Sequence, residues 1–250
     1  MISEYFNELS IKKVETKFGN VSYRTNSTGG NTLVLIHGLA ATSKSWNKFI
    51  NYLPKSINLI IPDLLGHGES DAPNIEYHVT NQTAIIEEIL KKEEVSSYVL
   101  FGHSYGGWVA TLLSIKNKNL KALILEDSNG LKAFFNEVKG TKKREEYKKN
   151  LIKKALFLNA NEYVVKSIVN DEFSTHQLSD DDLVNISVPT LILWGELDQT
   201  VDRKFGYMFK KLIHNSELEI IKNSKHTPHY SNPEKTADIV KDFLAKIKFL

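Results

Sequence analysis

The sequence has 250 residues, and a folded chain of this length buries about 70% of the surface that it exposes when unfolded, so it can form one large core. Its 32 basic and 30 acidic residues leave a net charge of +2, which gives no reason to expect nucleic acid as a partner and favours a small molecule. The absence of cysteine excludes disulfides, thiolate catalysis and cysteine metal sites.

The chain shows no sign of a membrane span or of division into several domains. No apolar run approaches the roughly 18 residues that span a bilayer, and residues 1–13 lack the basic-then-apolar pattern of a signal peptide. We therefore expect a cytoplasmic protein with no integral membrane span. No Pro/Gly/Ser-rich linker divides the chain, which predicts one domain carrying an insertion, while the oligomeric state is not readable.

The first predicted element is an antiparallel hairpin, because residues 11–18 and 21–25 flank Gly19-Asn20, a dipeptide suited to a two-residue turn with positive φ. Continuous apolar runs typical of strands buried on both faces of a parallel sheet follow at residues 33–36, 59–61, 98–101, 122–125 and 191–193.

Helical patterns lie between these runs, so strand and helix alternate. Trp46, Phe49, Ile50 and Leu53 fall at i, i+3, i+4 and i+7, and Ala84, Ile85 and Ile89 repeat the helical spacing. The last helix has Asn232 as its expected N-cap, Pro233 at its first position, and a buried stripe of Ile239, Val240, Phe243, Leu244 and Ile247. The alternation predicts an α/β fold with a mostly parallel, doubly wound sheet.

Residues 131–186 interrupt the alternation with helix-like segments, and we interpret them as an inserted helical lid, with residues 1–130 and 187–250 forming the core. A basic run from Lys139 to Lys154 would suit anionic substrates or a membrane surface. The apolar spacing of Tyr147, Leu151, Ala155 and Leu158 favours instead a helix whose lysines line its solvated side.

The most informative motif is Gly102-His103-Ser104-Tyr105-Gly106-Gly107, which lies between a predicted strand and a predicted helix. A G-x-S-x-G sequence in this position is a nucleophile elbow, in which a sharp turn exposes the serine oxygen and glycines leave room for neighbouring elements. Ser104 is therefore the candidate nucleophile.

A serine nucleophile needs a histidine base and a carboxylate that orients it. His226 follows the apolar run 218–221 in a polar loop that it shares with the alternative His229. Asp198 follows the strand predicted at residues 191–193, and its competitors are Asp127, Glu126 and Asp202. Both Asp198 and His226 are expected at the carboxyl edge of the sheet, where ligands bind in open α/β sheets.

The backbone amides of Leu39 and Tyr105 are the predicted oxyanion donors, because His37-Gly38-Leu39-Ala40 follows a buried strand opposite the elbow. Alone, the same residues would fit a simple strand-ending turn. Asp63, His67 and Ser70, in the glycine-containing segment after another strand, are expected to hydrogen-bond within their own loop.

We expect no metal site and no cofactor. The histidines show no H-x-x-x-H or H-x-H spacing on a predicted helix or strand with nearby carboxylates, and no phosphate-binding glycine motif occurs. The candidate pocket residues are His37, His103, Trp108, Phe134, Phe157 and His229, and the aromatic residues of the lid, which include Phe135 and Tyr163, suit either core or pocket.

Taken together, these motifs resemble the α/β hydrolases of the lid-bearing esterase, lipase and carbon-carbon hydrolase type, over nearly the whole chain. The resemblance is carried in chain order by residues 37–40, Asp63 to Ser70 as D-x-x-G-H-G-x-S, residues 102–107, Trp194-Gly195-Glu196-Leu197-Asp198, and His226 before Pro228. It implies an eight-stranded sheet with helices on both faces, a lid after the sixth strand, and nucleophile, acid and base at Ser104, Asp198 and His226.

The chain departs from the family pattern at several positions. Lys225 stands where glycine often precedes the histidine, and Ser231 replaces an acidic residue before the last helix. Leu39-Ala40 matches neither the G-G-G extension of some esterases nor the proline of perhydrolase-like members, so neither subclass is favoured. Serine rather than aspartate at the elbow argues against haloalkane dehalogenases and epoxide hydrolases.

The expected function is a serine hydrolase that cleaves small-molecule carboxylic esters of small or medium acyl chains through an acyl-enzyme. The alternatives are hydrolysis of a carbon-carbon bond in a dienoate-type ketone, acyl transfer to an alcohol, and a slow-turnover receptor that keeps the hydrolase shape.

Overall fold

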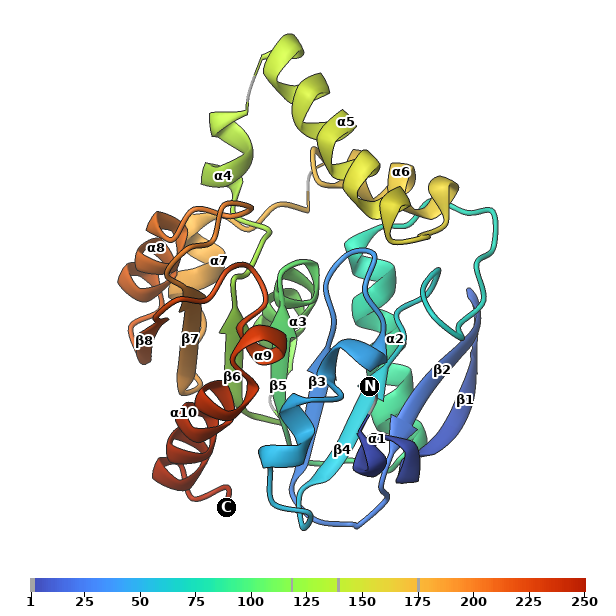
Figure 1. Cartoon of the computed structure of the whole chain (residues 1–250), viewed down its shortest axis with the longest axis vertical. Helices are drawn as coiled ribbons and strands as arrows, with labels where there is room; N and C mark the ends of the chain where they lie inside the picture. The colour runs from blue at the N-terminus through green and yellow to red at the C-terminus, as the bar shows by residue number, and fades with distance from the viewer. Residues whose placement is uncertain (1–2, 118, 139, 175) are drawn as a thin grey trace.

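An eight-stranded sheet forms the centre of the computed structural model, which describes residues 3–117, 119–138, 140–174 and 176–250 (Figure 1). The strand order is β1-β2-β4-β3-β5-β6-β7-β8, and all neighbours are parallel except β1 with β2 and β2 with β4. The strands are β1 (Ser10–Thr16), β2 (Gly19–Thr25), β3 (Thr32–Ile36), β4 (Asn58–Pro62), β5 (Tyr98–His103), β6 (Leu120–Glu126), β7 (Thr190–Gly195) and β8 (Ser216–Ile221). The predicted mostly parallel sheet of eight strands is confirmed.

Helices cover both faces of this sheet (Figure 1). One apolar cluster contains residues of α2 (Val79–Lys92), α3 (Tyr105–Lys116) and α8 (Lys204–Leu212), and the other contains residues of α1 (Glu4–Glu8) and α10 (Pro233–Lys246). Because successive strand residues point to opposite faces, Leu100 belongs to the first cluster and Phe101 to the second. Both faces of the central strands are therefore buried, as their continuous apolar runs predicted.

Between β6 and β7, the described residues form the helices α4 (Lys132–Glu137), α5 (Thr141–Phe157), α6 (Glu162–Asp171) and α7 (Asp180–Val184). In Figure 1, α5 and α6 lie above the edge of the sheet at which the parallel strands end. The helix α7 packs instead against α8 beside the sheet. The chain between β6 and β7 is therefore helical, and its two central helices stand over the carboxyl edge.

The first hairpin is confirmed, but its predicted turn is wrong. Gly19 pairs with Thr16, so the two-residue turn consists of Lys17-Phe18 and not of Gly19-Asn20. The Thr16 hydroxyl accepts from the Phe18 amide at 3.0 Å and donates to the Gly19 carbonyl at 2.8 Å, which closes the turn early. Asn20 is held in the strand because its amide and side chain both donate to Asp71.

The apolar spacing from Trp46 to Leu53 does not form the predicted α-helix. The segment consists of two 3-10 turns, Ser43–Trp46 and Phe49–Tyr52, separated by Asn47-Lys48. The Asn47 side chain donates to the Lys44 carbonyl at 2.6 Å, so it competes with the backbone bond that a continuous helix would need. The predicted apolar residues are nevertheless buried, since the 3-10 turns bring Trp46 and Phe49 against Phe101.

The last helix begins at Pro233, as predicted, and Val240, Phe243 and Leu244 are buried. The side chain of Asn232 does not cap this helix, because its side-chain amide group donates to the Ser224 hydroxyl in the loop after β8. No helix in the described part of the chain has the length and apolar character required to cross a membrane.

The apolar face predicted for the basic segment is only partly present on α5. Ala155 is buried and Tyr147 packs against Phe134, whereas Leu158 is 61% exposed because it lies beyond the end of the helix. Lys139, the first residue of the basic run, lies outside the described residues.

Candidate active site

Ser104 occupies a strained turn between β5 and α3. Its φ of 52° and ψ of −117° lie in a region that non-glycine residues rarely adopt, and its amide donates to the Glu126 carbonyl at 2.9 Å. The flanking glycines are required sterically: a Cβ on Gly102 would lie 2.3 Å from the Gly106 carbonyl oxygen, and one on Gly106 would lie 2.3 Å from that of Ile36. The turn therefore has the geometry expected of a nucleophile elbow.

His226 lies beside this serine, although 122 positions separate them in the sequence. Its Nε2 lies 3.0 Å from the Ser104 hydroxyl oxygen, a distance at which the hydroxyl donates to the ring. The loop that carries it follows β8 and is joined to the loop after β7 by the Leu197 amide, which donates to the Ser224 carbonyl at 2.8 Å.

Asp198 completes the contact chain from the loop after β7. His226 Nδ1 donates to Asp198 Oδ2 at 2.8 Å, and the other carboxylate oxygen accepts from the amides of Thr200 at 2.7 Å and Val201 at 3.2 Å. The Asp198 side chain is fully buried, while that of His226 is 20% exposed. The two amide contacts thus orient the carboxylate toward the imidazole.

Asp127, one of the competing acids, lies behind this chain at the end of β6. Its Oδ1 accepts from the Gly195 amide at 2.8 Å, and its Oδ2 is buried. Burial, followed by the negative charges of Glu126 and Asp198, raises the pKa of Asp127 well above its usual value. Asp127 therefore holds a proton more readily than an exposed aspartate does, and it contacts the Gly195 amide rather than the His226 ring.

The other competing residues have partners of their own. The Glu126 carboxylate accepts two hydrogen bonds from His229, one from its main-chain amide at 2.8 Å and one from Nδ1 of its imidazole. The side chains of Glu126 and His229 are both fully buried. The His229 ring also stacks on Trp46 at 4.1 Å between centroids. Asp202 is exposed and accepts from the Lys204 amide at the start of α8. None of these carboxylates contacts the His226 ring.

A cavity of about 710 Å³ lies beside Ser104 and His226, within the size range of small-molecule sites. Residues 38–47 and the histidine loop line it from the core, and α5 and the residue after it line it from above. The side chains that α5 and Leu158 contribute are Leu151, Lys154, Ala155 and Leu158. Nothing in the sequence pattern indicated that Lys44, Lys154, Thr200 and Tyr230 would line the same cavity.

Comparison with known proteins assigns the fold to a family. A profile of the Alpha/beta hydrolase family matches residues 33–239. The chain belongs to the α/β hydrolase family. Lipase 1 of Psychrobacter immobilis is 25% identical over 269 residues, which cover 95% of this chain and 84% of that protein. Monoacylglycerol lipase ABHD6 of Mus musculus is 24% identical over 267 residues, which cover 86% and 76% of the two chains.

A solved structure of a thermophilic esterase from Thermogutta terrifontis has the same fold, with a TM-score of 0.80 at 20% identity over 95% of this chain and 99% of that one. Membership of the α/β hydrolase family, with lipases among the relatives, supports hydrolase activity.

Among the candidate pocket residues, the structure places His103 and His229 at the cavity of this α/β hydrolase. His103 is buried, and its Nε2 donates to the His226 carbonyl at 2.6 Å. Burial, together with the nearby histidines His229 and His226, lowers the pKa of His103 well below its usual value, so the ring is neutral.

The other four candidates do not line this cavity. His37 is buried and its Nε2 accepts from the Leu64 amide at 3.0 Å, so it belongs to the loop packing. Trp108 and Phe134 are buried in the apolar core, where Trp108 packs against Phe135 of α4 and Phe134 packs against Phe205 of α8. Phe157 is 87% exposed at the end of α5, since the helix turns its opposite side toward the core.

The segment after β4 has the structural role predicted for it. Asp63 accepts from the amides of Ser43 at 2.6 Å and Glu69 at 2.9 Å, and the Ser70 hydroxyl donates to the Asp63 carbonyl at 2.5 Å. His67 is buried against His37, and burial lowers its pKa to about 3. Asp63 thus links this segment to the 3-10 turn that begins at Ser43, next to the cavity.

The residues that carry the two predicted oxyanion donors, Leu39 and Tyr105, lie close to Ser104. Leu39 lines the cavity directly after Gly38, at which an added Cβ would lie 3.2 Å from the Ser104 Cβ. Tyr105 is the first residue of α3, so its amide has no acceptor within the helix. Their role as oxyanion donors remains a prediction that these positions are compatible with.

Proposed function

We propose that this α/β hydrolase is a serine hydrolase that cleaves carboxylic esters of small or medium acyl chains through a Ser104-His226-Asp198 triad. The observation that carries the proposal is the continuous contact from Ser104 Oγ to His226 Nε2 at 3.0 Å and from His226 Nδ1 to Asp198 Oδ2 at 2.8 Å. Most of the surface that lines the cavity at this serine is apolar, with Leu39 and Leu151 among its side chains, which suits an acyl chain.

The proposed reaction begins when Ser104 Oγ attacks the ester carbonyl carbon while His226 takes the hydroxyl proton. Asp198 keeps Nδ1 of the imidazole protonated, so that Nε2 is free to accept. The amides of Leu39 and Tyr105 donate to the developing oxyanion. The tetrahedral intermediate expels the alcohol, which receives the proton from His226, and water then releases the acid from the acyl-enzyme.

The helices α5 and α6 are proposed to act as a lid over this cavity, within an insertion that spans residues 131–186. Leu151, Lys154 and Ala155 of α5 line the cavity wall opposite the core. Ala155 packs with Val165 and Val169 of α6 in an apolar cluster that also contacts Leu39. A helix pair attached in this way limits which acyl chains fit and excludes water from the serine.

The proposal is tested by labelling with a fluorophosphonate probe, which reacts with activated serines. The wild type is expected to be labelled and Ser104→Ala is expected to lose all labelling. Ser114→Ala is the matched control, because Ser114 lies in the same helix α3 but its hydroxyl donates to the Thr111 carbonyl. Labelling that persists in Ser104→Ala, or a wild type that is never labelled, would contradict the assignment of the nucleophile.

Turnover of p-nitrophenyl esters from acetate to laurate then tests the substrate class. We expect the highest kcat/KM at short or medium chains, because the cavity of about 710 Å³ is closed on one side by α5. Near-zero turnover of every ester, together with a rise in Tm on ligand binding, would favour the slow-turnover receptor instead.

One observation favours carbon-carbon bond hydrolysis as a second candidate. Lys154 of α5 and Lys44 line the cavity, and a cation there would pair with the carboxylate of a dienoate-type ketone. Turnover of a vinylogous diketone carboxylate, compared with the ester panel, separates the two reactions. For the second candidate, Lys154→Met should raise the KM for the diketone and leave that for neutral esters unchanged.

A further inference from the structure

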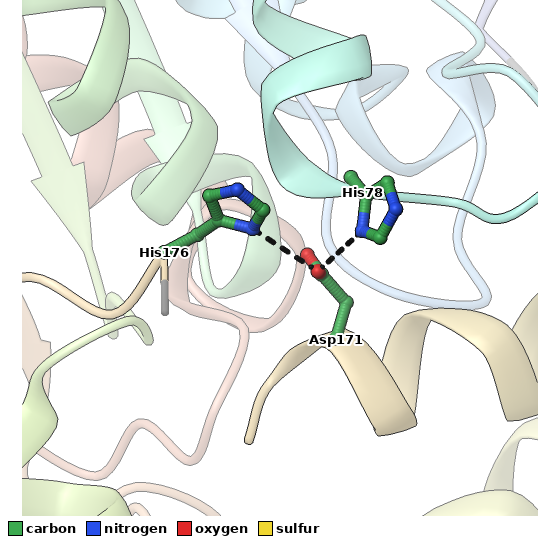
Figure 2. Close-up of side chains that lie close together, drawn as sticks. All are labelled: His78, Asp171 and His176. Atoms are coloured by element: carbon green, nitrogen blue, oxygen red, sulfur yellow. Dashed lines mark hydrogen bonds and ion pairs between the residues drawn. The ribbon is translucent and has the colours of Figure 1, made fainter. Parts of the chain in front are cut away.

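Two histidines and an aspartate lie together at the junction of α6 and α2 (Figure 2), and none of the three lines the cavity at Ser104. His78 directly precedes α2, Asp171 is the last residue of α6, and His176 lies in the loop after it. Asp171 Oδ1 is 2.7 Å from Nδ1 of His78 and 3.2 Å from Nδ1 of His176. The three donor atoms therefore converge on one point, as the dashed lines of Figure 2 show.

The carboxylate is held in position by a fixed contact. Asp171 Oδ2 accepts from the Val79 amide at 2.8 Å, which directs Oδ1 toward the two rings. The Asp171 side chain is 2% exposed, whereas those of His78 and His176 are 38% and 32% exposed. An ion from solvent can thus reach a charged oxygen that is otherwise enclosed by protein.

The contacts of His78 favour a positive charge beside its ring nitrogens. Its Nε2 lies 3.1 Å from Glu76 Oε2 and its Nδ1 lies 2.7 Å from Asp171 Oδ1, so both ring nitrogens face carboxylate oxygens. A neutral imidazole has one N–H and can donate to only one of them. Both contacts are satisfied together when the ring carries a second proton, or when a metal ion takes the place of the proton on Nδ1 and Nε2–H donates to Glu76.

We propose that His78 Nδ1, Asp171 Oδ1 and His176 Nδ1 bind a divalent transition-metal ion of the zinc class. Imidazole nitrogens and a carboxylate oxygen are ligands that Zn²⁺ prefers, with bonds of roughly 2.0–2.2 Å. Two ligands of a tetrahedral zinc site then lie roughly 3.4 Å apart, and the Oδ1–Nδ1 distances of 2.7 and 3.2 Å require only a small outward movement of the rings. Water completes the coordination shell.

Glu76 fits the role of an outer partner in this site. Metal-binding histidines commonly donate their second N–H to a carboxylate, which fixes the ring orientation and makes the bound nitrogen a better ligand. The contact between His78 Nε2 and Glu76 has this arrangement.

The bound ion would fasten α6 to the start of α2. The Tyr77 amide already donates to the Ser167 hydroxyl of α6 at 2.8 Å, next to the Val79–Asp171 contact. A metal ion between His78 and Asp171 replaces their direct contact with stronger metal bonds that join the same two segments. Because an ion that binds only the folded chain stabilises it, metal binding is expected to raise Tm without any change at Ser104.

The test is a zinc titration of the full-length protein after removal of metals with a chelator. Isothermal titration calorimetry should show one tight Zn²⁺ site per chain, and Tm should rise by about 5–10 °C at a 100-fold excess over Kd. His78→Gln and His176→Gln should abolish this site, and Glu76→Gln should weaken it about 10–100-fold. None of these variants changes Asp171, because the Asp171 carboxylate accepts from the Val79 amide at the start of α2 and its substitution could impair folding.

Two controls locate the site. His214→Gln removes an exposed histidine elsewhere and should leave zinc binding intact. His226→Gln should also leave it intact, although His103, Asp127 and His226 form another convergent group within the active site. The proposal is overturned if no tight zinc binding is found, if His78→Gln and His176→Gln bind like the wild type, or if only His226→Gln loses the ion.

Discussion

His103 Nε2 donates to the main-chain carbonyl of His226 at 2.6 Å, which links the elbow at the end of β5 to the loop after β8 across 123 positions of sequence. Burial keeps the His103 ring neutral, so it has a single N–H, and this contact uses it. The position of the His226 imidazole relative to Ser104 therefore depends on a neighbouring side chain as well as on its own loop.

Replacing His103 with alanine is expected to lower kcat/KM for a p-nitrophenyl ester by about 10–100-fold, because the loss of a buried hydrogen bond costs roughly 1–3 kcal/mol and releases the His226 loop. His103→Gln should recover part of the rate, since its amide N–H can donate to the same carbonyl. The pH profile of kcat should shift in the alanine variant if His226 moves. Equal rates for the alanine variant and the wild type would show that His103 does not position His226.

The two aspartates near His226 are expected to respond very differently to the same chemical change. Asp198→Asn should lower kcat by about 10⁴-fold, because an amide in that position favours the wrong imidazole tautomer. Asp127→Asn should keep most of the activity, since burial already favours the uncharged form of Asp127 and the amide oxygen of asparagine can still accept from the Gly195 amide. Burst and steady-state kinetics on one ester measure both. A larger loss in Asp127→Asn would transfer the acid role to that residue.

Much of the fold could be predicted from the sequence, because the apolar runs of buried parallel strands and the glycines of the elbow have local causes. The same local reasoning failed at the first turn, where Thr16 closes the hairpin before Gly19. Local reasoning also failed from residue 46 to 53, where it predicted an α-helix. Two short 3-10 turns form there instead and still bury the apolar side chains against Phe101.

The candidate site was predicted less completely. Ser104, Asp198 and His226 each follow a recognisable strand, whereas the cavity wall depends on how α5 is rotated, which no local pattern determines. Phe157 therefore faces solvent while Lys154 lines the cavity. Short histidine spacings could not have found the group at Asp171 either, because 93 positions separate it from His78.

The close approach at the elbow predicts a severe effect for a single methyl group. Gly106→Ala would place its Cβ 2.3 Å from the Ile36 carbonyl oxygen, which belongs to a central strand and cannot move away. We expect a loss of more than about 4 kcal/mol in the free energy of unfolding, or no soluble protein. In Gly29→Ala, the added Cβ meets nothing within 4 Å, so only the left-handed backbone is penalised, by roughly 1–2 kcal/mol. Urea unfolding of both variants measures the contrast, and similar losses would contradict it.

Glu172 should make the stability of the protein depend on pH. Its side chain is buried under the inserted helices, where it contacts Asn129 and Tyr147, and burial raises its pKa to about 8 from the usual 4.5. At pH values between these two pKa values, the Glu172 carboxyl group is ionised in the unfolded chain and still protonated in the folded chain. The free energy of unfolding should therefore fall as pH rises from about 4.5 to about 8, by up to roughly 1.4 kcal/mol per pH unit from this group.

Glu172→Gln should remove that dependence, because the amide is neutral at every pH, can accept from Asn129 and can donate to the Tyr147 hydroxyl. Compared with the wild type, the variant should gain stability progressively from pH 5 to pH 8, and the gain should level off above pH 8 as Glu172 ionises in the folded chain. Thermal unfolding across this range measures it, with Glu15→Gln, an exposed position on β1, as the matched control. If the Tm difference between Glu172→Gln and the wild type were the same at pH 5 and pH 8, Glu172 would not carry its proton in the folded protein.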